Sequence, residues 1–327
     1  MKTYFNPMTF LRNLKWAFSL NGAKELHDLQ WRMEKMERDI RTLNPDAASF
    51  QRLRLYQDLL ESEGGPYRDE IAFLRQHGRL DIFPYEPIRA FPEVVVHKDT
   101  DRGMPYLLHE GKRLYYPTSW NTGQITGSYL QCTAVEGILG GGCLAKSPHC
   151  YLSGSVGVRA GDVVADLGAA EGLFALHVAE RAEKLYVCEC DALWWDALRA
   201  TFEPYAEKTV FVEKAIGRAD TDTSVRLDSL LAAERGKRMV IKMDVEGAEY
   251  QTLRASSPWL SGEKRVALLC AAYHRQEDAG RLRHLVAEWG YETEFSEGFM
   301  LFLFDRLTHP FFRHGVLRAW TPGFWGS

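Results

Sequence analysis

The regular alternation of apolar strands and helices over residues 161–304 constrains the fold more than any other feature of this sequence. Five short apolar segments, each typical of a buried strand, are each followed by a helical pattern. This alternation predicts a parallel, doubly wound α/β sheet. Two further strands, Tyr291–Phe295 and Phe299–Phe304, have no room for a helix between them, so they must form an antiparallel hairpin.

A mainly parallel sheet of seven strands with a C-terminal antiparallel hairpin is the arrangement of the class I methyltransferase (Rossmann-like) fold. A nicotinamide-binding Rossmann domain does not normally end in this way. The sequence predicts this domain over residues 151–305. A helical N-terminal region (1–80) and an irregular, proline-rich lead-in or cap segment (81–150) precede it, and an aromatic C-terminal tail (306–327) follows.

Composition and charge narrow the classes of partner. The formal net charge of −4 gives no reason to expect nucleic acid. The absence of a long apolar run predicts no stable membrane insertion, and the first twenty residues do not fit a signal peptide. The six cysteines form no CxxC pair, which suits reduced thiols in a cytoplasmic protein.

The two ends of the chain leave alternatives open. Apolar residues from Leu26 to Leu43 recur at heptad spacing. They fit a coiled-coil seam that makes a homo-oligomer, or an amphipathic helix packed on the rest of the protein, which we favour. In the lead-in segment, one helix is expected near Ser128–Leu139. For the aromatic tail we rank packing on the helical N-terminal region first, contact with an acceptor second and a membrane surface last.

A glycine-rich turn after the first of these strands favours a nucleoside ligand. It reads Asp166-Leu167-Gly168, and Gly172 opens the next helix. Glycines let the backbone pass close to a ligand at the C-terminal edge of a parallel sheet. The turn lacks the third glycine of GxGxxG and the Lys-Ser/Thr pair of a P-loop, and Glu171 would repel a phosphate. Since that charge is harmless beside a cationic sulfonium, S-adenosylmethionine is the expected cofactor, with Asp166 facing its amino group.

Two further positions complete the predicted cofactor site. Glu189 ends the second strand, about twenty residues after the glycine turn, where an acid binds ribose hydroxyls in dinucleotide folds. A carboxylate accepts two hydrogen bonds from a vicinal diol and rejects a 2′-phosphate. Ala215 ends the third strand, where the edge of an adenine would lie.

The fourth strand carries the string IKMDVEGAE, and with it the sequence resembles the FkbM family of S-adenosylmethionine-dependent methyltransferases. The other matching pieces are GDVVADLGAAEG, the acid Glu189, VEKAIG and VRLDSLL, which together span roughly residues 145–305. The resemblance implies the class I fold. It also implies O-methylation, because characterised members act largely on sugars or natural products. Ala170 and Glu171 stand where the family's turn often has Asn-Ile.

Candidate catalytic residues lie at the C-terminal ends of strands. Asp244 ends the fourth strand, Glu246 follows it, and His274 lies just past the fifth strand. A neutral imidazole suits the removal of a hydroxyl proton better than an ordinary carboxylate, and His149 can enter from the cap. Two alternatives stay open: the acids near Glu246 are favoured at a helix start for structural reasons alone, or Asp244 and Glu246 hold a divalent ion. We commit to no metal.

These observations predict an O-methyltransferase whose acceptor is a hydroxyl of a small molecule or glycan, most of all a sugar. An N-methyltransferase is the alternative within enzymes, but the Asn/Asp-Pro-Pro-Tyr/Phe string of that class is replaced here by DVEG. A non-catalytic, cofactor-binding scaffold is the alternative of another class. The intact glycine turn and Glu189 argue against it, since a scaffold has no need of them.

Overall fold

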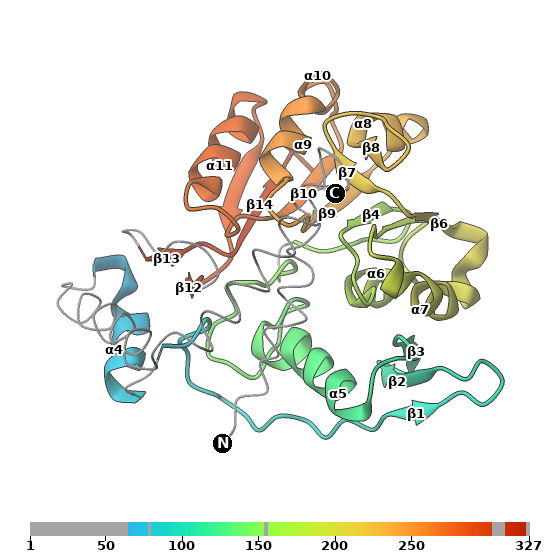
Figure 1. Cartoon of the computed structure of the whole chain (residues 1–327). Helices are drawn as coiled ribbons and strands as arrows, with labels where there is room; N and C mark the ends of the chain where they lie inside the picture. The colour runs from blue at the N-terminus through green and yellow to red at the C-terminus, as the bar shows by residue number, and fades with distance from the viewer. Residues whose placement is uncertain (1–64, 78–79, 154–155, 303–310, 325–327) are drawn as a thin grey trace, which may run out of the picture.

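The computed structural model describes residues 65–77, 80–153, 156–302 and 311–324. Its main sheet has seven strands in the order β11-β14-β10-β9-β4-β5-β6 (Figure 1). All neighbouring strands of this sheet are parallel except at β14, which is antiparallel to both β10 and β11. The strands are β4 (Val163–Leu167), β5 (Lys184–Cys188), β6 (Thr209–Val212), β9 (Met239–Met243), β10 (Val266–Ala271), β11 (Glu292–Phe295) and β14 (Val316–Trp320).

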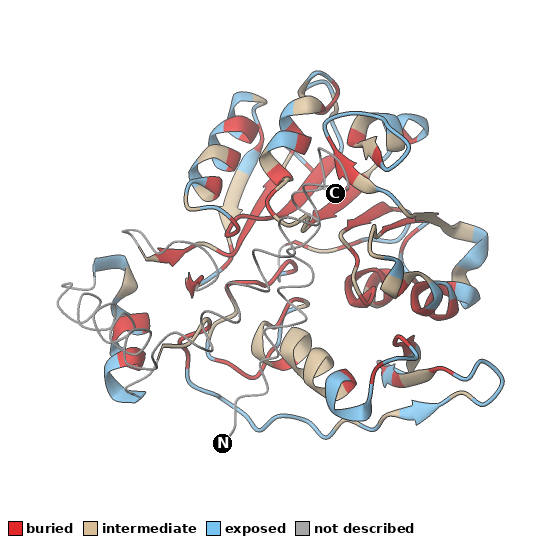
Figure 2. Ribbon diagram, in the orientation of Figure 1, coloured by how far each residue is buried: buried red, intermediate tan, exposed pale blue. Residues whose placement is uncertain are grey.

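Helices cover both faces of the sheet, so its central strands are buried throughout (Figure 2). Because side chains alternate along a strand, Val164 packs on one face while Val163 and Ala165 pack on the other. The first face carries α6 (Leu173–Val178), α7 (Ala192–Phe202) and the 3-10 turn η3 (Glu203–Lys208). The second carries α8 (Leu227–Leu230), η4 (Ala232–Glu234), α9 (Glu249–Ala255), α10 (Ser257–Leu260) and α11 (Asp278–Glu288).

The third predicted strand divides into two. β6 ends at Val212, and a short parallel pair outside the main sheet follows, formed by β7 (Ala215–Gly217) and β8 (Ser224–Arg226). The chain therefore leaves the main sheet before Ala215, which places that residue at the edge of the cleft described below.

The lead-in segment packs on the face that carries α6 and α7. It forms a three-stranded antiparallel sheet of β1 (His97–Lys98), β2 (Pro105–His109) and β3 (Lys112–Tyr115), then α5 (Thr122–Leu130) and a π-helical turn η2 (Gln131–Val135). Leu107, Leu114 and Ile125 share one core with α6 and α7. The helix starts earlier than the predicted Ser128, because Asn121 and Gln124 form a reciprocal capping box.

The identity of the last sheet strand corrects the sequence-based hairpin. The seventh strand is β14, from the aromatic tail, and it lies between β10 and β11. The segment expected to fill that place begins instead with β12 (Met300–Leu301), which pairs with β13 (Phe312–Arg313) outside the main sheet. The predicted boundary between residues 305 and 306 therefore divides the sheet. The tail supplies β14 to the domain itself, while Phe312 packs against α4 of the N-terminal region, as expected.

Two residues explain why β14 was not predicted from the sequence. Arg318 lies in the middle of β14, yet it is buried, and its guanidinium donates hydrogen bonds to the backbone oxygens of Tyr151 (2.9 Å) and Cys150 (2.7 Å). A side chain at Gly315 would overlap the carbonyl oxygen of Pro148. Both the hydrogen bonds of the buried arginine and the close approach at the glycine are contacts with residues far away in the sequence. The spacing of apolar residues along a strand gives no information on such contacts.

The described part of the N-terminal region contains η1 (Gly65–Tyr67) and α4 (Arg68–His77). α4 buries Ile71 and Leu74 in a small core with Leu301 and Phe312. The heptad segment from Leu26 to Leu43 lies outside the described residues. All six cysteines are free thiols, as expected. No helix among the described residues is long and apolar enough to cross a membrane.

Candidate active site

Two clefts meet at the C-terminal edge of β4 and β9. The first, which we call the glycine-turn cleft, is bounded by the turn after β4, the end of β5, β7 and the β9–α9 loop. The second, the lead-in cleft, lies between that edge and the lead-in segment and has a volume of about 520 Å³. The two clefts share four lining residues: Gly168, Ala170, Asp244 and Glu246.

Gly168 allows the two loops at this junction to approach. Its φ is +77°, a left-handed conformation that favours glycine, and a Cβ there would overlap the carbonyl oxygen of Asp244. Ala170 and Glu246 also have positive φ, of 48° and 56°. Non-glycine residues in this conformation are held against a steric cost and occur often at functional sites. The described residues contain only one other such residue, Glu110.

Two of the predicted cofactor residues are structural instead. Asp166 is fully buried and does not line either cleft. Its carboxylate pairs with Lys242 Nζ at 3.0 Å and accepts a hydrogen bond from the Ala175 amide. Gly172 also lines neither cleft, and a Cβ there would press on Leu198 of α7. Asp166 therefore holds β4 to β9, and Gly172 lets α6 pack against α7.

Both partners of the Asp166–Lys242 ion pair are buried. Burial alone would lower the pKa of Lys242, but the carboxylates of Asp166 and Asp244 raise it, so the ammonium stays charged. Lys242 Nζ also donates to the carbonyl oxygen of Gly168 at 2.6 Å. The lysine thus fixes the backbone of the glycine turn from below.

Glu189 lines the glycine-turn cleft, as predicted. Its carboxylate accepts hydrogen bonds from the amides of Ala170 (2.8 Å) and Asp191 (2.7 Å), which fix its orientation. Each carboxylate oxygen keeps a further lone pair for a ligand hydroxyl. Burial raises the pKa of Glu189 to about 7, so the free carboxyl titrates close to neutral pH. Ala215 lines the same cleft, with its amide bonded to Thr223.

Asp244 stands at the junction of the two clefts with four side chains around its carboxylate. The Tyr151 hydroxyl donates to Oδ2 at 2.8 Å, and the Tyr273 hydroxyl lies 3.4 Å from both oxygens. His149 Nε2 lies 3.4 Å from Oδ2 and His274 Nε2 lies 3.5 Å from Oδ1. Burial alone would raise the pKa of Asp244, but the two histidines hold it far below its usual range. Asp244 is therefore ionised.

His149 lines the lead-in cleft and bridges two acids. Its Nδ1 lies 2.5 Å from Glu136, and its Nε2 faces the Tyr151 hydroxyl at 3.0 Å as well as Asp244. Both ring nitrogens face acceptors, as an imidazolium requires. Burial opposes this charge, but Glu136 and Asp244 raise the pKa of His149 to about 9. His149 is thus protonated at neutral pH.

His274 does not occupy the position predicted for a base. It is buried, lines neither cleft, and faces Glu249 at 3.1 Å and Glu246 at 3.4 Å. Burial alone would lower its pKa, but these acids raise the pKa well above the ordinary value. We therefore correct its role: His274 is a buried cation that holds the β9–α9 loop. We call the whole group the cleft cluster; its members are Glu136, His149, Asp244, Glu246, Glu249 and His274.

A metal ion at this place is the alternative that the sequence left open. Asp244, Glu249 and His274 each offer one ligand atom within 4.8 Å of the others. His274 already lies between Glu249 (3.1 Å) and Glu246 (3.4 Å), and Glu249 also accepts from the Val245 amide at 2.9 Å. We therefore interpret the group as an ion-pair network.

Sequence reasoning missed Glu136, Tyr151 and Tyr273. Each belongs to a segment whose pattern looks apolar or irregular, and only the packing of the lead-in segment on the sheet brings them to Asp244. One local signal does exist, since Glu136 follows the π-helical turn η2, and such turns are frequent at functional sites.

The strand order, with β14 antiparallel between β10 and β11, is that of the class I methyltransferases. A comparison with protein-family models matches residues 166–293 to the methyltransferase FkbM domain. Those residues therefore form an FkbM methyltransferase domain, which confirms the predicted family for that part of the chain. A comparison with curated proteins gave no match.

Solved structures resemble the chain at low identity. One is the methyltransferase FkbM from Methylobacillus flagellatus KT, with 18% identity and a TM-score of 0.40; the match covers 51% of this chain and 46% of that one. Another is the precorrin-6y C5,15-methyltransferase from Geobacter metallireducens GS-15, with 12% identity, a TM-score of 0.35 and coverage of 51% and 84%. Trm5b from Pyrococcus abyssi has 14% identity, a TM-score of 0.35 and coverage of 66% and 54%. The chain thus spans less than half of the FkbM structure.

Proposed function

We propose that the chain binds S-adenosylmethionine in the glycine-turn cleft and transfers its methyl group to a hydroxyl of a sugar-like acceptor in the lead-in cleft. The observation that carries the proposal is the junction of the two clefts at Gly168, Ala170, Asp244 and Glu246. A methyl donor on one side and a hydroxyl on the other would meet there. When bound, the cofactor supplies an electrophilic methyl group on a cationic sulfonium.

The residues of the glycine-turn cleft fit this cofactor. Gly168 leaves the space that a Cβ would take, and Glu189 presents a fixed carboxylate to a vicinal diol. The backbone of Ala215 and Ile216 borders the far end of the cleft. The ionised Asp244 gives the junction a negative charge, which favours a cationic centre over a neutral one.

The lead-in cleft suits a polar acceptor. Its lining includes uncharged hydrogen-bonding side chains from α5, its N-cap and its π-helical extension, together with aromatic side chains. Amides and hydroxyls both donate and accept, which matches the many hydroxyls of a sugar. These residues are Asn121, Gln124, Ser128, Gln131, Trp194 and Tyr273.

His149 is the residue that we assign to proton removal. In the free protein it is protonated, because Glu136 and Asp244 stabilise its charge. If Asp244 were engaged by a cationic ligand at the junction, only Glu136 would stabilise the charge of His149. The pKa of His149 would then fall, and its proton would leave to solvent. The neutral imidazole, oriented by Glu136, would then accept the proton of the acceptor hydroxyl during methyl transfer.

Two measurements test this proposal. Calorimetric titration with S-adenosylmethionine should show one site, weakened by Glu189→Gln but not by Glu288→Gln, an exposed glutamate on α11. A methyl-transfer assay on sugars, phenols and amines should show product on the sugar hydroxyls, with a raised KM for Ser128→Ala and an unchanged cofactor Kd. Absence of cofactor binding would refute the cofactor site, whereas transfer to amines alone would refute the acceptor class.

A further inference from the structure

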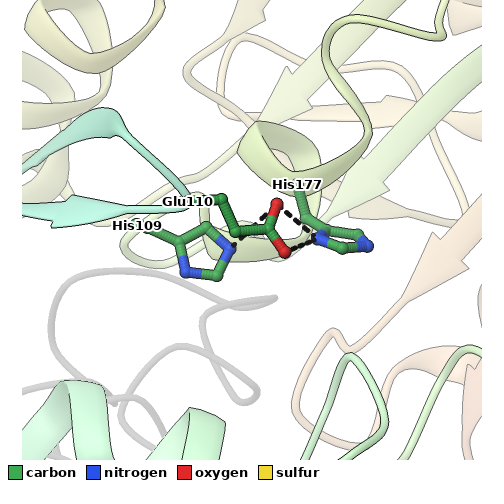
Figure 3. Close-up of side chains that lie close together, drawn as sticks. All are labelled: His109, Glu110 and His177. Carbon is green, nitrogen blue, oxygen red and sulfur yellow. Dashed lines mark hydrogen bonds and ion pairs between the residues drawn. The ribbon is translucent and has the colours of Figure 1, made fainter.

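A second group of histidines and a glutamate lies outside both clefts, where the lead-in segment meets α6. His109 ends β2, Glu110 is in the turn between β2 and β3, and His177 belongs to α6 (Figure 3). Figure 3 shows Glu110 between the two rings, with one nitrogen of each ring turned toward its carboxylate. One ligand atom from each residue lies within 4.8 Å of the others. We call this group the hairpin site.

His109 has an unsatisfied nitrogen that points into the group. The residue is 5% exposed, and its Nδ1 lies 3.0 Å from the Tyr129 hydroxyl. Its Nε2 is buried without a hydrogen-bond partner and lies 3.9 Å from Glu110 Oε2. Buried polar atoms nearly always have a partner. If Nδ1–H donates to Tyr129, the lone pair of Nε2 faces the carboxylate, an arrangement that a cation between them would satisfy.

His177 completes the group from the other side. Its Nδ1 lies 3.0 Å from both carboxylate oxygens of Glu110. Both residues thus present a ring nitrogen to the same carboxylate, His177 through Nδ1 and His109 through Nε2.

The backbone of Glu110 is held in an unfavourable conformation. Its φ is +50° and that of Gly111 is +80°, as in a two-residue hairpin turn of the primed type. Asn or Asp normally precedes Gly in such turns. The only other non-glycine residues with positive φ in the described residues are Ala170 and Glu246, which both line the two clefts. Glu110, the third non-glycine residue with positive φ, thus presents its carboxylate to two histidines.

We propose that His109, Glu110 and His177 bind one transition-metal ion, with Zn²⁺ as the best fit, and that this ion fastens the β2–β3 hairpin to α6. Two imidazoles and one carboxylate are a common ligand set for zinc, and a fourth position stays open to water. Lys112 Nζ lies 3.7 Å from Glu110 Oε2, and the charge of Arg181 acts on His177. These cations disfavour Mg²⁺ or Ca²⁺, which depend on carboxylates, more than a metal bound through imidazole.

The consequence concerns the cofactor domain. α6 follows directly after the glycine turn and has Gly172 as its N-cap, so an ion on His177 would couple the lead-in segment to the helix that this turn opens. The site is reachable from solvent, since the Glu110 side chain is 48% exposed.

The test is titration of the metal-stripped full chain with Zn²⁺ against a chromogenic zinc indicator. The wild type should bind one more zinc ion than His177→Gln or Glu110→Gln, or bind it at least tenfold more tightly. The matched control is His284→Gln, an exposed histidine on α11 beside Glu288, and it should bind as the wild type does. Circular dichroism checks that each variant is folded; His177 and Glu110 are chosen because they are less buried than His109.

Two further readouts separate this site from the free cysteines. The Co²⁺ complex should lack intense thiolate-to-cobalt absorption, and Zn²⁺ should raise the unfolding temperature of the wild type but not of His177→Gln. Equal zinc binding by the wild type and both variants, or thiolate absorption that persists in His177→Gln, would overturn the proposal. So would a wild type that binds no zinc, which would leave His177 and Glu110 as a hydrogen-bonded pair.

Discussion

The cleft cluster and the hairpin site contain the same kinds of residue, yet their histidines differ in charge. In the cleft cluster, Glu136 and Asp244 hold His149 in its protonated form. In the hairpin site, two histidines share the single, half-exposed Glu110, and burial keeps them neutral. The number of buried carboxylates around each imidazole therefore decides its protonation state. With several carboxylates the ring is protonated, and with few it is neutral and keeps a lone pair for a ligand.

The two regions also share a backbone feature. Each contains a glutamate with positive φ followed by a glycine, Glu110-Gly111 in the hairpin and Glu246-Gly247 after β9. In both places the turn aims a carboxylate at a histidine. The following experiments probe how far this parallel extends.

The largest effect is expected for Asp244→Asn in the cleft cluster. The substitution leaves His149 and His274 without their shared carboxylate, and breaking such a buried pair costs about 3–5 kcal/mol. We expect methyl transfer to fall by about 10³-fold as well, since the proton-accepting histidine loses its alignment. Chemical denaturation and initial rates measure the two effects. The matched change in the hairpin site is Glu110→Gln. If this variant lost as much stability as Asp244→Asn does, the carboxylates of the two regions would not differ in how strongly they stabilise the protein.

The pH dependence of stability is the next largest effect. The pKa of His149 is raised from 6.5 to about 9 in the folded protein. Its stabilisation is therefore fully present below pH 6.5 and is lost as pH rises through 9, by roughly 3 kcal/mol. Tyr151, Tyr273, Glu136 and Asp244 face the ring, and the pKa of Asp244 is held far below this pH range.

Denaturation curves between pH 6.5 and 9.5 measure this loss. His149→Gln should flatten the curve. The kcat/KM of the wild type, which reports the free protein, should rise over the same range as the imidazole becomes neutral. A wild-type stability that stays level, together with a rate that falls, would assign the proton acceptor elsewhere.

A smaller effect is expected at Glu189. Loss of one charge-assisted hydrogen bond costs about 1.5–3 kcal/mol, so Glu189→Gln should weaken cofactor binding roughly tenfold to a hundredfold. Because burial raises the pKa of Glu189 to about 7, the wild-type affinity should also fall as pH drops through 7, when the carboxylate is protonated. Calorimetry at pH 6 and 8 tests both statements. An affinity that does not change with pH in the wild type, or with the substitution, would remove Glu189 from the cofactor site.

The smallest effect compares the two strained glutamates. Glycine adopts positive φ without the steric cost, so Glu110→Gly should change the unfolding free energy of the metal-free protein by less than about 1 kcal/mol. Glu246→Gly relieves the same strain but removes a group from the cleft junction, so it should slow methyl transfer about tenfold or more. Denaturation and rate assays of both variants give the comparison. If Glu110→Gly instead destabilises the metal-free chain strongly, its carboxylate is a structural tie and the parallel fails.

Much of the architecture could be predicted from the sequence because it depends on local pattern. The alternation of strands and helices predicted a seven-stranded sheet, and the glycine turn and the acid at Glu189 predicted the position of one cleft. Gly168, Glu189 and Ala215 line that cleft, and their contact with the cofactor stays a prediction. Asp166 and Gly172 belong to the same motif, but their roles are structural. Asp166 pairs with the buried Lys242, and Gly172 lets α6 pack against α7.

Only the tertiary structure decided the last strand, the members of the cleft cluster and the charges of the histidines. β14 escaped prediction because Arg318 is buried through hydrogen bonds to the lead-in segment, which is far away in the sequence. The same contacts place His149 and Tyr151 over Asp244. A local sequence pattern shows which residues face a core. The pKa of a buried histidine depends instead on which charged side chains lie around it, and long-range packing determines those neighbours.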